Sequence, residues 1–357
     1  MPKDDHASVN RVEALDLLRL VAVLGVVLYH YGFRGASVGD HTWAALPYLS
    51  SFAMYGYLGV PAFFVISGFV IAYSAEGRTA SEFAIARFSR IYPTFVLCMT
   101  ITALGILFFG GELFQVSFAR WAANLAIASP ALGFPYMDSA YWSLVIEVTF
   151  YAWVTVLIAT GLFPRRLDAL VLAWLFLSMT NELTADSAIL EKVFLTDNAG
   201  YFATGLMLYE FHRGRRDLMW VCIFGLSVGI AVFHAIHSLG WLHAHSDVVF
   251  QPSVVATIFL ASVAAIFLAT RLNVPLLPSK ITIAIGALTY PFYLLHQQLG
   301  YAILSRFPPQ YQSAATVCLI VLAIAAASWS ICRYIEVPLR TTTRQLLSKA
   351  LLLRAAA

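Results

Sequence analysis

The sequence predicts an all-α polytopic membrane protein, a bundle of about ten transmembrane helices with both termini in the cytoplasm. Composition is the first observation behind this prediction. Hydrophobic residues make up 60% of the 357 residues, charged residues make up 11%, and the mean hydropathy is +0.78. So few charged residues cannot cover a water-soluble surface. The net charge of +3 is spread over short connections, so no nucleic-acid partner is implied.

A series of long apolar stretches is the second observation. A helix needs about 20 mostly apolar residues to cross the roughly 30 Å hydrocarbon core of a bilayer. The first stretch follows an acidic amino end without a small-residue cleavage pattern, so we expect a retained helix rather than a signal peptide. In chain order, the stretches lie near residues 13–33, 56–75, 93–110, 142–163, 168–183, 193–212, 218–238, 252–270, 281–304 and 313–333.

The third observation is the distribution of Lys and Arg, which concentrate in short cytoplasmic connections of membrane proteins. With the amino end inside, only four of the 22 Lys and Arg residues face outward: Arg34, Arg120, Lys192 and Arg306. This asymmetry favours an even number of spans. We expect one membrane domain over residues 1–340 and a short basic cytoplasmic tail over residues 341–357.

The first stretch contains three ionisable residues, Asp16, Arg19 and His30. Arg19 and His30 are about three helical turns apart, roughly 16 Å of rise, which puts both on one stripe of a helix. Ionisable side chains at membrane depth cost about 2.5–3.5 kcal/mol each and normally face a bundle interior or a wet cavity. The alternative is that Arg19 snorkels to the interface and His30 only hydrogen-bonds a neighbouring helix.

The second stretch contains Gly59 and Gly68 at the two ends of the run GVPAFFVISG. Small residues on one helix face let neighbouring helices approach closely in membranes. We therefore expect this face to pack against other helices.

The third stretch is preceded by Arg87-Phe-Ser-Arg90-Ile-Tyr-Pro93. The two arginines are three residues apart, on one face of what we expect to be a short amphipathic cytoplasmic helix that ends at Pro93. Two guanidinium groups on one side suit a phosphate ligand. Alternatively, they serve only as positive charge on the cytoplasmic side.

Polar residues also recur in the fourth and ninth stretches. Ser143, Glu147 and Tyr151 are spaced by four residues, so they form a polar stripe along one helix face. The ninth stretch contains Tyr290, Tyr293 and His296. We expect His30, Glu147 and His296 to lie at a similar depth in the outer half of the membrane, where Glu147 would orient an imidazole.

Metal and disulfide chemistry are not indicated. The histidines His234, His237, His243 and His245 are close in sequence, but only one carboxylate, Asp247, accompanies them, so we expect no metal site. The four cysteines lie in apolar runs without close pairing, which supports neither a disulfide framework nor a cysteine metal site.

Taken in order, these motifs resemble the signature series of the bacterial acyltransferase-3 family. Its members are integral membrane enzymes that acylate lipopolysaccharide O-antigens, exopolysaccharides, nodulation factors and some macrolides. The resemblance covers nearly the whole chain and implies a multi-pass protein of the bacterial plasma (inner) membrane. It rests on Asp16-x2-Arg19-x10-His30, FFVISGF, RFSRIYP, WSLVIEVTFY, TYPFYLLH and the closing Tyr334-Ile-Glu336-Val-Pro338.

The resemblance implies that His30 is the catalytic residue, that Arg19 supports the same site, and that Arg87 and Arg90 contact the phosphates of acyl-CoA. It also implies acyl-CoA as co-substrate, with acetyl-CoA the expected form, and no permanently bound cofactor. We expect Glu147 to hold the second nitrogen of the imidazole, as the orienting member of a dyad does. Residues expected to support the site are Asp16, Trp142, Ser143, Tyr290, Tyr293 and His296.

The implied reaction moves an acyl group from cytoplasmic acyl-CoA to a hydroxyl of an extracytoplasmic or lipid-linked glycan, with imidazole as general base. An exopolysaccharide, a lipopolysaccharide and a lipid-linked oligosaccharide are all possible acceptors. Pro61 and Val148 depart from the family pattern, which leaves the acceptor open. Many relatives append a soluble esterase-like domain, whereas only seventeen residues follow Arg340. We therefore expect the chain to act alone or to hand its product to a separate periplasmic acyltransferase.

A proton-coupled transporter or exporter of a glycan or small molecule is the alternative function. Ionisable groups inside a membrane also build proton relays. A transporter should contain two similar halves with interrupted helices at matching positions, and the sequence shows no internal repeat. A weaker option is a different membrane acyltransferase or glycosyltransferase fold that also uses an intramembrane histidine.

Overall fold

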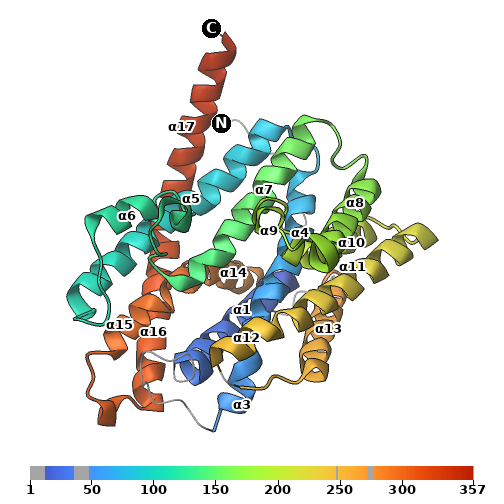
Figure 1. Cartoon of the computed structure of the whole chain (residues 1–357). Helices are drawn as coiled ribbons and strands as arrows, with labels where there is room; N and C mark the ends of the chain where they lie inside the picture. The colour runs from blue at the N-terminus through green and yellow to red at the C-terminus, as the bar shows by residue number, and fades with distance from the viewer. Residues whose placement is uncertain (1–12, 36–47, 247, 272–276, 357) are drawn as a thin grey trace.

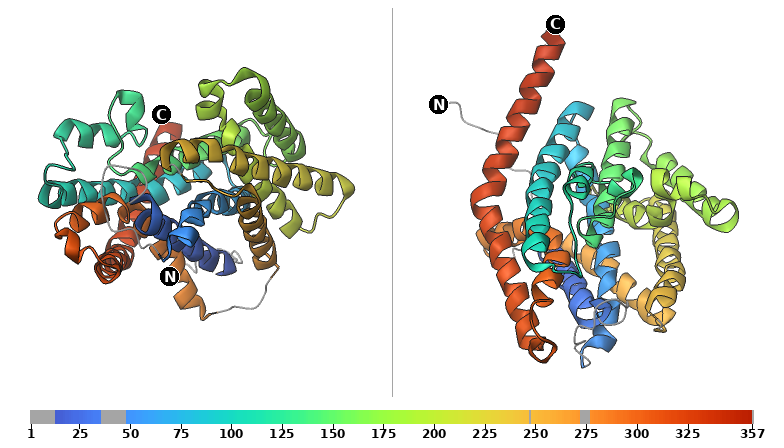
Figure 2. Two further views of the ribbon diagram at one scale, coloured as in Figure 1. Left: turned by 60° about the horizontal axis from the view of Figure 1, so that its bottom comes forward. Right: turned by 60° about the vertical axis from the view of Figure 1, so that its left-hand side comes forward.

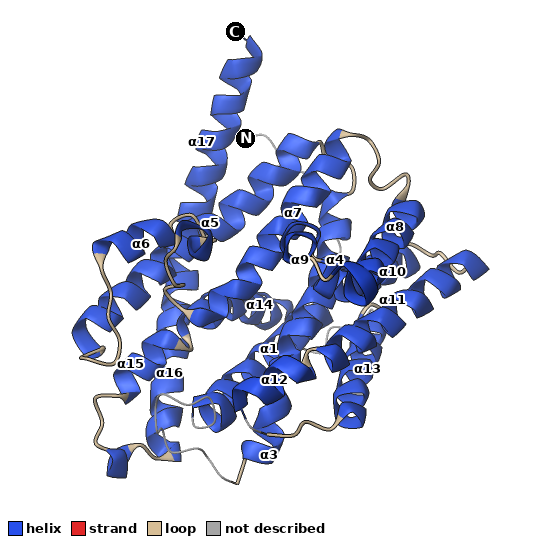
Figure 3. Cartoon of the chain, viewed as in Figure 1, coloured by secondary structure: helices blue, strands red, loops and turns tan. Residues whose placement is uncertain are grey.

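The computed structural model describes residues 13–35, 48–246, 248–271 and 277–356, and this part of the chain is helical without any β-strand (Figure 3). Its α-helices are α1 (Glu13–Tyr29), α3 (Ser50–Ala53), α4 (Gly59–Ala75), α5 (Ala80–Phe109), α6 (Phe118–Asn124), α7 (Trp142–Ala159), α8 (Leu167–Thr180), α9 (Ala188–Phe194), α10 (Ala199–His212), α11 (Leu218–His237), α12 (Leu239–Ser246), α13 (Pro252–Ala269), α14 (Ser279–Leu295), α15 (Gln298–Leu304), α16 (Ala314–Ile331) and α17 (Val337–Ala356). Three π-helical turns, η1 (His30–Arg34), η5 (Asn181–Ala185) and η8 (Cys332–Glu336), and the 3-10 turns η2 (Met54–Leu58), η3 (Ser129–Leu132), η4 (Ser139–Tyr141), η6 (Thr196–Asn198) and η7 (Pro309–Tyr311) join or extend them.

The prediction of an all-α polytopic membrane protein is confirmed. All ten predicted stretches are helical, but within the described residues eight helical segments are long and apolar enough to cross a membrane. The two exceptions are α10, with 14 residues, and α14, with 17 residues. The predicted helices were too long because an apolar stretch does not reveal where a helix breaks. The structure divides the stretch 281–304 into α14 and α15, and the stretch 193–212 into η6 and α10.

The helices form two groups, and α1 packs against both (Figures 1 and 2). The first group includes α4, α8, α10, α11 and α13, and the second includes α5, α14, α15 and α16. Leu15 and Val26 of α1 are buried in the core of the first group, whereas Val23 and Val27 are buried in that of the second. Side chains of α1 therefore reach both halves of the molecule.

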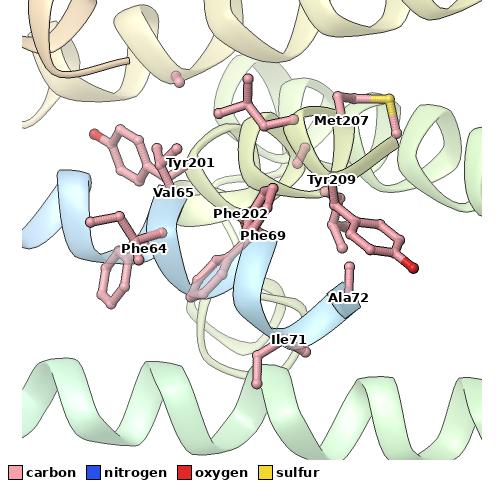
Figure 4. Packing of buried hydrophobic residues seen from close by; sticks show 14 of the residues in the cluster. Phe64, Val65, Phe69, Ile71, Ala72, Tyr201, Phe202, Met207 and Tyr209 are labelled. Carbon is pink, nitrogen blue, oxygen red and sulfur yellow. The ribbon is translucent and has the colours of Figure 1, made fainter. Parts of the chain in front are cut away.

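Helices α4 and α10 cross at close range, as the small-residue face of α4 predicts. A Cβ atom placed on Gly68 would lie 2.3 Å from the carbonyl oxygen of Phe202, and one on Gly205 would lie 2.1 Å from that of Val65. Gly59 meets α1 in the same way. Aromatic rings fill the space beside this crossing, where Phe64 stacks on Phe202 at 4.9 Å between ring centroids (Figure 4). These close approaches fix the position of α4 relative to α10 and α1.

Helix α5 corrects the prediction of a short cytoplasmic helix that ends at Pro93. The helix begins at a capping box in which Thr79 and Glu82 satisfy each other's backbone N–H groups, and it continues through Pro93 to Phe109. Proline removes one backbone hydrogen bond but does not stop a helix that tertiary packing supports. Phe95, which follows the proline, is completely buried. Arg87 and Arg90 therefore lie on a membrane-length helix rather than on a separate surface helix.

Helix α17 extends well beyond the rest of the bundle (Figures 1 and 2). It follows the π-helical turn η8, and its described backbone runs from Val337 to Ala356. The expected boundary between residues 340 and 341 falls inside this helix, and the division into a membrane domain and a tail stays a prediction.

Candidate functional site

His30 lies where the first helix changes its geometry. The α-helical part of the first span ends at Tyr29, and His30 begins the π-helical turn η1. Single π-helical turns inside helical segments are frequent at functional sites because they redirect side chains. The His30 side chain is directed into the interior, and the residue is only 8% exposed.

His296 lies at a second interruption, the break between α14 and α15. Its backbone N–H donates to Phe292 O at 3.1 Å, and its ring nitrogen Nδ1 lies 2.6 Å from Tyr293 O. The chain turns at Gln297, and the N–H of Gln298 then donates to the Asp138 carboxylate at 2.8 Å. Both histidines thus lie at irregular helical positions that buried hydrogen bonds hold in place.

The two histidines lie side by side, with 5.1 Å between their ring centroids. Two tyrosines from the same two segments brace the pair. The hydroxyl of Tyr301 donates to His30 O at 2.8 Å, and the hydroxyl of Tyr31 donates to His296 O. Because each tyrosine binds the backbone of the opposite segment, the bonds fix the position of η1 relative to the α14–α15 break. Gly300 provides the space that Tyr31 needs for this contact.

One nitrogen of each imidazole is buried without a hydrogen-bond partner in the part of the chain that the structure describes. These atoms are Nδ1 of His30 and Nε2 of His296. Buried polar atoms are normally hydrogen-bonded, and exceptions in native structures often have a chemical role. The His30–His296 pair is therefore a candidate acid–base centre.

A cavity of about 110 Å³, which we call the arginine cavity, is lined by Tyr293, the neighbour of His296, but by neither histidine. Arg19 of α1 and Arg87 and Arg90 of α5 line it together. The spacing in the sequence predicted that Arg87 and Arg90 lie close together. The tertiary structure adds Arg19 to them. Its complete lining is Arg19, Val60, Phe63, Phe64, Ser67, Val70, Arg87, Arg90, Ile91, Ser143, Leu144, Glu147, Tyr151, Thr289, Tyr290, Tyr293 and Leu294.

The predicted polar stripe of α7 is confirmed, because Ser143, Glu147 and Tyr151 all line the arginine cavity. The expectation that Glu147 orients His30 is wrong. The Glu147 carboxylate accepts hydrogen bonds from Ser67 Oγ, at 3.0 Å, and from the Tyr151 hydroxyl, and it bonds neither histidine. Depth along α7 explains the difference, since one helical turn separates Glu147 from Ser143, the stripe residue nearer the histidines.

Tyr293 connects the arginine cavity to the histidine pair. Its ring lines the cavity and lies 5.4 Å from the His296 ring, measured between centroids. Its hydroxyl is within hydrogen-bond distance of Ser143 Oγ, at 2.7 Å, and its carbonyl oxygen binds His296. Tyr290, one turn earlier, also lines the cavity and donates to Ile91 O at 3.1 Å. One face of α14 therefore lines the arginine cavity and also contacts His296.

A second cavity of about 400 Å³ lies on the other side of Arg19 and Arg90, which line both cavities. Asp16 and Arg340 also line it, and Asp16 accepts a hydrogen bond from Arg19 at 3.0 Å. This ion pair is largely buried, so the snorkelling alternative for Arg19 does not describe the structure. Arg340 belongs to α17, which sequence reasoning did not connect with the site because α17 is remote in the chain.

The remaining predicted residues lie apart from the centre. Trp142 is 44% exposed and lines neither of these cavities. Among the four clustered histidines, His234 is buried and its Nε2 lies 3.1 Å from Ser178 Oγ. The described residues contain no group of three or more His, Cys, Asp or Glu that could hold a metal ion, and Asp247 lies outside them.

Comparison with known proteins adds independent information. The family described as "Acyltransferase domain" matches residues 12–333. Nodulation protein 10 of Rhizobium leguminosarum bv. viciae is 28% identical over 194 residues, which cover 48% of this chain and 51% of the relative. The peptidoglycan O-acetyltransferase OatA of Listeria monocytogenes is 26% identical over 170 residues, 42% of this chain and 25% of the relative.

A putative O-acetyltransferase of Staphylococcus aureus is 28% identical over 175 residues, 43% of this chain and 26% of the relative. The matched segments thus span about half of the nodulation protein and about a quarter of the two O-acetyltransferases. No solved structure matches the chain.

Proposed function

The chain belongs to the acyltransferase-3 family, and on that premise we propose that it is a membrane O-acyltransferase that moves an acyl group from acyl-CoA to a hydroxyl group of a glycan. The observation that carries the proposal is the arrangement of charge and base. Arginines line two cavities, Tyr293 lines one of them, and the Tyr293 ring lies 5.4 Å from His296 of the buried histidine pair.

The arginines support an anionic donor. Guanidinium groups bind phosphate oxygens through charge-assisted and often bidentate hydrogen bonds. Arg19 and Arg90 both line the two cavities, but Arg19 is paired with Asp16. Arg90 is therefore the natural centre of such a site, joined by Arg340 in the second cavity and by Arg87 in the arginine cavity. We assign the phosphates of acyl-CoA to the second cavity. The uncharged pantetheine arm would then extend through the arginine cavity towards Tyr293.

His30 would act as the general base at the end of this path. A sugar hydroxyl is a weak nucleophile, and a positioned imidazole that removes its proton typically accelerates the attack by about 10²–10⁴-fold. The oxygen attacks the thioester carbonyl, a C–O bond forms, and the C–S bond breaks to release the CoA thiolate. Because His30 is only 8% exposed, little bulk water would reach a thioester bound beside it.

Glycans are the acceptors that the printed names of the relatives support. OatA is named as a peptidoglycan O-acetyltransferase, and the other relative is named as a nodulation protein. Acetyl is accordingly the acyl group that we propose. Because the arginines lie towards the expected cytoplasmic side and the histidines towards the outer side, we propose that acyl-CoA binds from the cytoplasm and that the glycan is modified at the outer face of the bacterial plasma membrane. A separate periplasmic acyltransferase would then take over the acylated product.

Sealed vesicles of known orientation would test the proposal. Radiolabelled acetyl-CoA would be supplied on the cytoplasmic face, and a peptidoglycan fragment or lipid-linked oligosaccharide would be confined to the opposite compartment. We expect label on the glycan only when both substrates and intact protein are present, and no label with the His30→Ala variant. Acyl transfer that requires both substrates on the cytoplasmic side would contradict the two-sided arrangement. Uptake of the glycan without acylation would instead support the transporter alternative.

A further inference from the structure

His296 carries a ring nitrogen that the proposed reaction has not used. Its Nδ1 lies 2.6 Å from Tyr293 O, and a carbonyl oxygen can only accept a hydrogen bond. The hydrogen of the neutral ring is therefore on Nδ1, and Nε2 carries a lone pair. That Nε2 atom is buried without a hydrogen-bond partner among the described residues. His296 can accept a proton at Nε2 without losing the bond that holds its ring.

His30 offers a matching group. Its Nδ1 is also buried without a partner in the described part of the chain, and the two ring centroids are 5.1 Å apart. Because the two nitrogens do not hydrogen-bond each other, one water molecule between the rings would carry the proton from one to the other. Neither the hydroxyl of Tyr31 nor that of Tyr301 occupies these nitrogens, because both donate to backbone oxygens.

We propose that His30 and His296 act as one proton-relay pair in the acyl transfer, an inference that rests on the proposed function. The acceptor hydroxyl gives its proton to His30 while its oxygen forms the new C–O bond with the thioester carbonyl carbon. His30 passes a proton from Nδ1 to His296 Nε2. When the C–S bond breaks, the protonated His296 delivers that proton to the departing thiolate sulfur, and CoA leaves as the thiol. Both rings are then neutral: His296 is back in its Nδ1–H form, and His30 carries the acceptor's proton on Nε2 until a tautomeric exchange returns it to Nδ1.

The position of His296 suits the delivery step. Its ring lies 5.4 Å from the Tyr293 ring, which lines the arginine cavity through which the pantetheine arm would extend. The sulfur of the donor would therefore lie on the His296 side of the pair. His30 would face the acceptor. This division of roles explains why two imidazoles are buried together, although each histidine costs more to bury than an apolar side chain.

Two substitutions at His296 separate a relay from a structural role. In His296→Asn, the side-chain amide can still donate to Tyr293 O, so the structural bond is kept while Nε2 is removed. In His296→Gln, the amide lies nearer the position of Nε2 but cannot be protonated. A purely structural His296 predicts near wild-type turnover for the asparagine variant. A relay predicts that both variants lose kcat by about 10- to 100-fold, with the KM for acetyl-CoA unchanged.

The control is His234→Gln, which alters another buried histidine that lies in the other helix group and bonds Ser178. We expect this variant to keep wild-type kcat. Each variant is purified in nanodiscs, and its amount and melting temperature are measured beside the wild type. If His296→Asn does not fold, the pH dependence of kcat in His296→Gln decides: a relay predicts that the imidazole-dependent limb of the wild-type profile changes, and an unchanged profile overturns the relay.

A double-variant cycle completes the test. Residues that act as a unit are strongly non-additive, so His30→Ala combined with His296→Asn should be no slower than His30→Ala alone. Losses that multiply, or a His296→Asn enzyme with wild-type kcat, would overturn the relay and leave the acyltransferase proposal intact. If wild-type protein transfers no acetyl group from acetyl-CoA to any glycan, both proposals fail together.

Discussion

Tyr31 and Gly300 fit against each other so closely that a Cβ atom on Gly300 would lie 1.6 Å from the Tyr31 hydroxyl oxygen. The Tyr31 hydroxyl donates a hydrogen bond to His296 O, and His30 directly precedes Tyr31 in the chain. The missing side chain of Gly300 is therefore part of what keeps the two imidazoles together.

Gly300→Ala should disrupt the histidine pair. The new methyl group must displace Tyr31, which breaks its bond to His296 O and shifts η1, so we expect kcat to fall at least tenfold. Gly225→Ala is the matched control, because no atom lies within 4 Å of a Cβ placed at Gly225. Tyr31→Phe, which loses only the hydrogen bond, worth about 1 kcal/mol, should be affected less. Equal activity of the Gly300 and Gly225 variants in a vesicle assay would contradict this account.

His30→Ala should abolish acyl transfer, with a loss of about 10²–10⁴-fold in kcat as expected for removal of a general base. Its abundance in the membrane should stay near that of the wild type, because the bond to Tyr301 uses the backbone oxygen of His30 rather than its ring. Quantified membranes and an acetyl-transfer assay test both points. Residual activity above a tenth of the wild type would refute a catalytic role for His30.

Arg90→Ala should chiefly raise the KM for acetyl-CoA. A charge-assisted hydrogen bond to phosphate contributes about 1.5–3 kcal/mol, which corresponds to roughly 10- to 150-fold in binding. Arg78→Ala is the control, because Arg78 is exposed and lines neither cavity. The measurement is the dependence of the initial rate on acetyl-CoA concentration. A change in kcat alone, with KM unaltered, would remove Arg90 from the donor site.

Glu147→Gln distinguishes two roles for Glu147: a negative charge beside the arginines, as in the structure, or a residue that orients His30, as expected from the sequence. In the structure Glu147 shares its cavity with three arginines, so loss of its negative charge should strengthen the binding of an anionic donor and lower the KM for acetyl-CoA severalfold. Glutamine can still accept from Ser67 and Tyr151. An orienting role towards His30 predicts instead a large loss of kcat with KM unchanged. Steady-state kinetics of the two variants Glu147→Gln and Glu147→Asp would separate these outcomes.

The membrane orientation is tested by cysteine labelling in a background without native cysteines. His245 and Arg216 are both exposed and lie near opposite ends of the α11–α12 segment. With both termini in the cytoplasm, a cysteine at 245 should react with an impermeant maleimide added to intact cells, and a cysteine at 216 should react only after permeabilisation. The reverse pattern would invert the assignment of donor and acceptor sides.

Much of the architecture follows from the sequence alone, because apolarity and helical periodicity are local properties. The charge deficit predicts a membrane protein, and each predicted stretch is helical. The spacing of Ser143, Glu147 and Tyr151 places them on one face, since 3.6 residues per turn determines which side chains share a stripe. For the same reason Arg87 and Arg90 line one cavity.

Only the tertiary structure decided which faces meet. His30 and His296 are far apart in the chain, and no periodicity relates them; their contact depends on how α1 packs against the α14–α15 break. Packing also placed Glu147 in the arginine cavity, where Ser67 and Tyr151 bond its carboxylate, rather than beside His30. It kept α5 continuous through Pro93, because the free energy of burying neighbouring side chains can exceed the cost of one lost backbone bond. Local sequence determines helices and their stripes, whereas the partners of each stripe depend on contacts summed over the whole bundle.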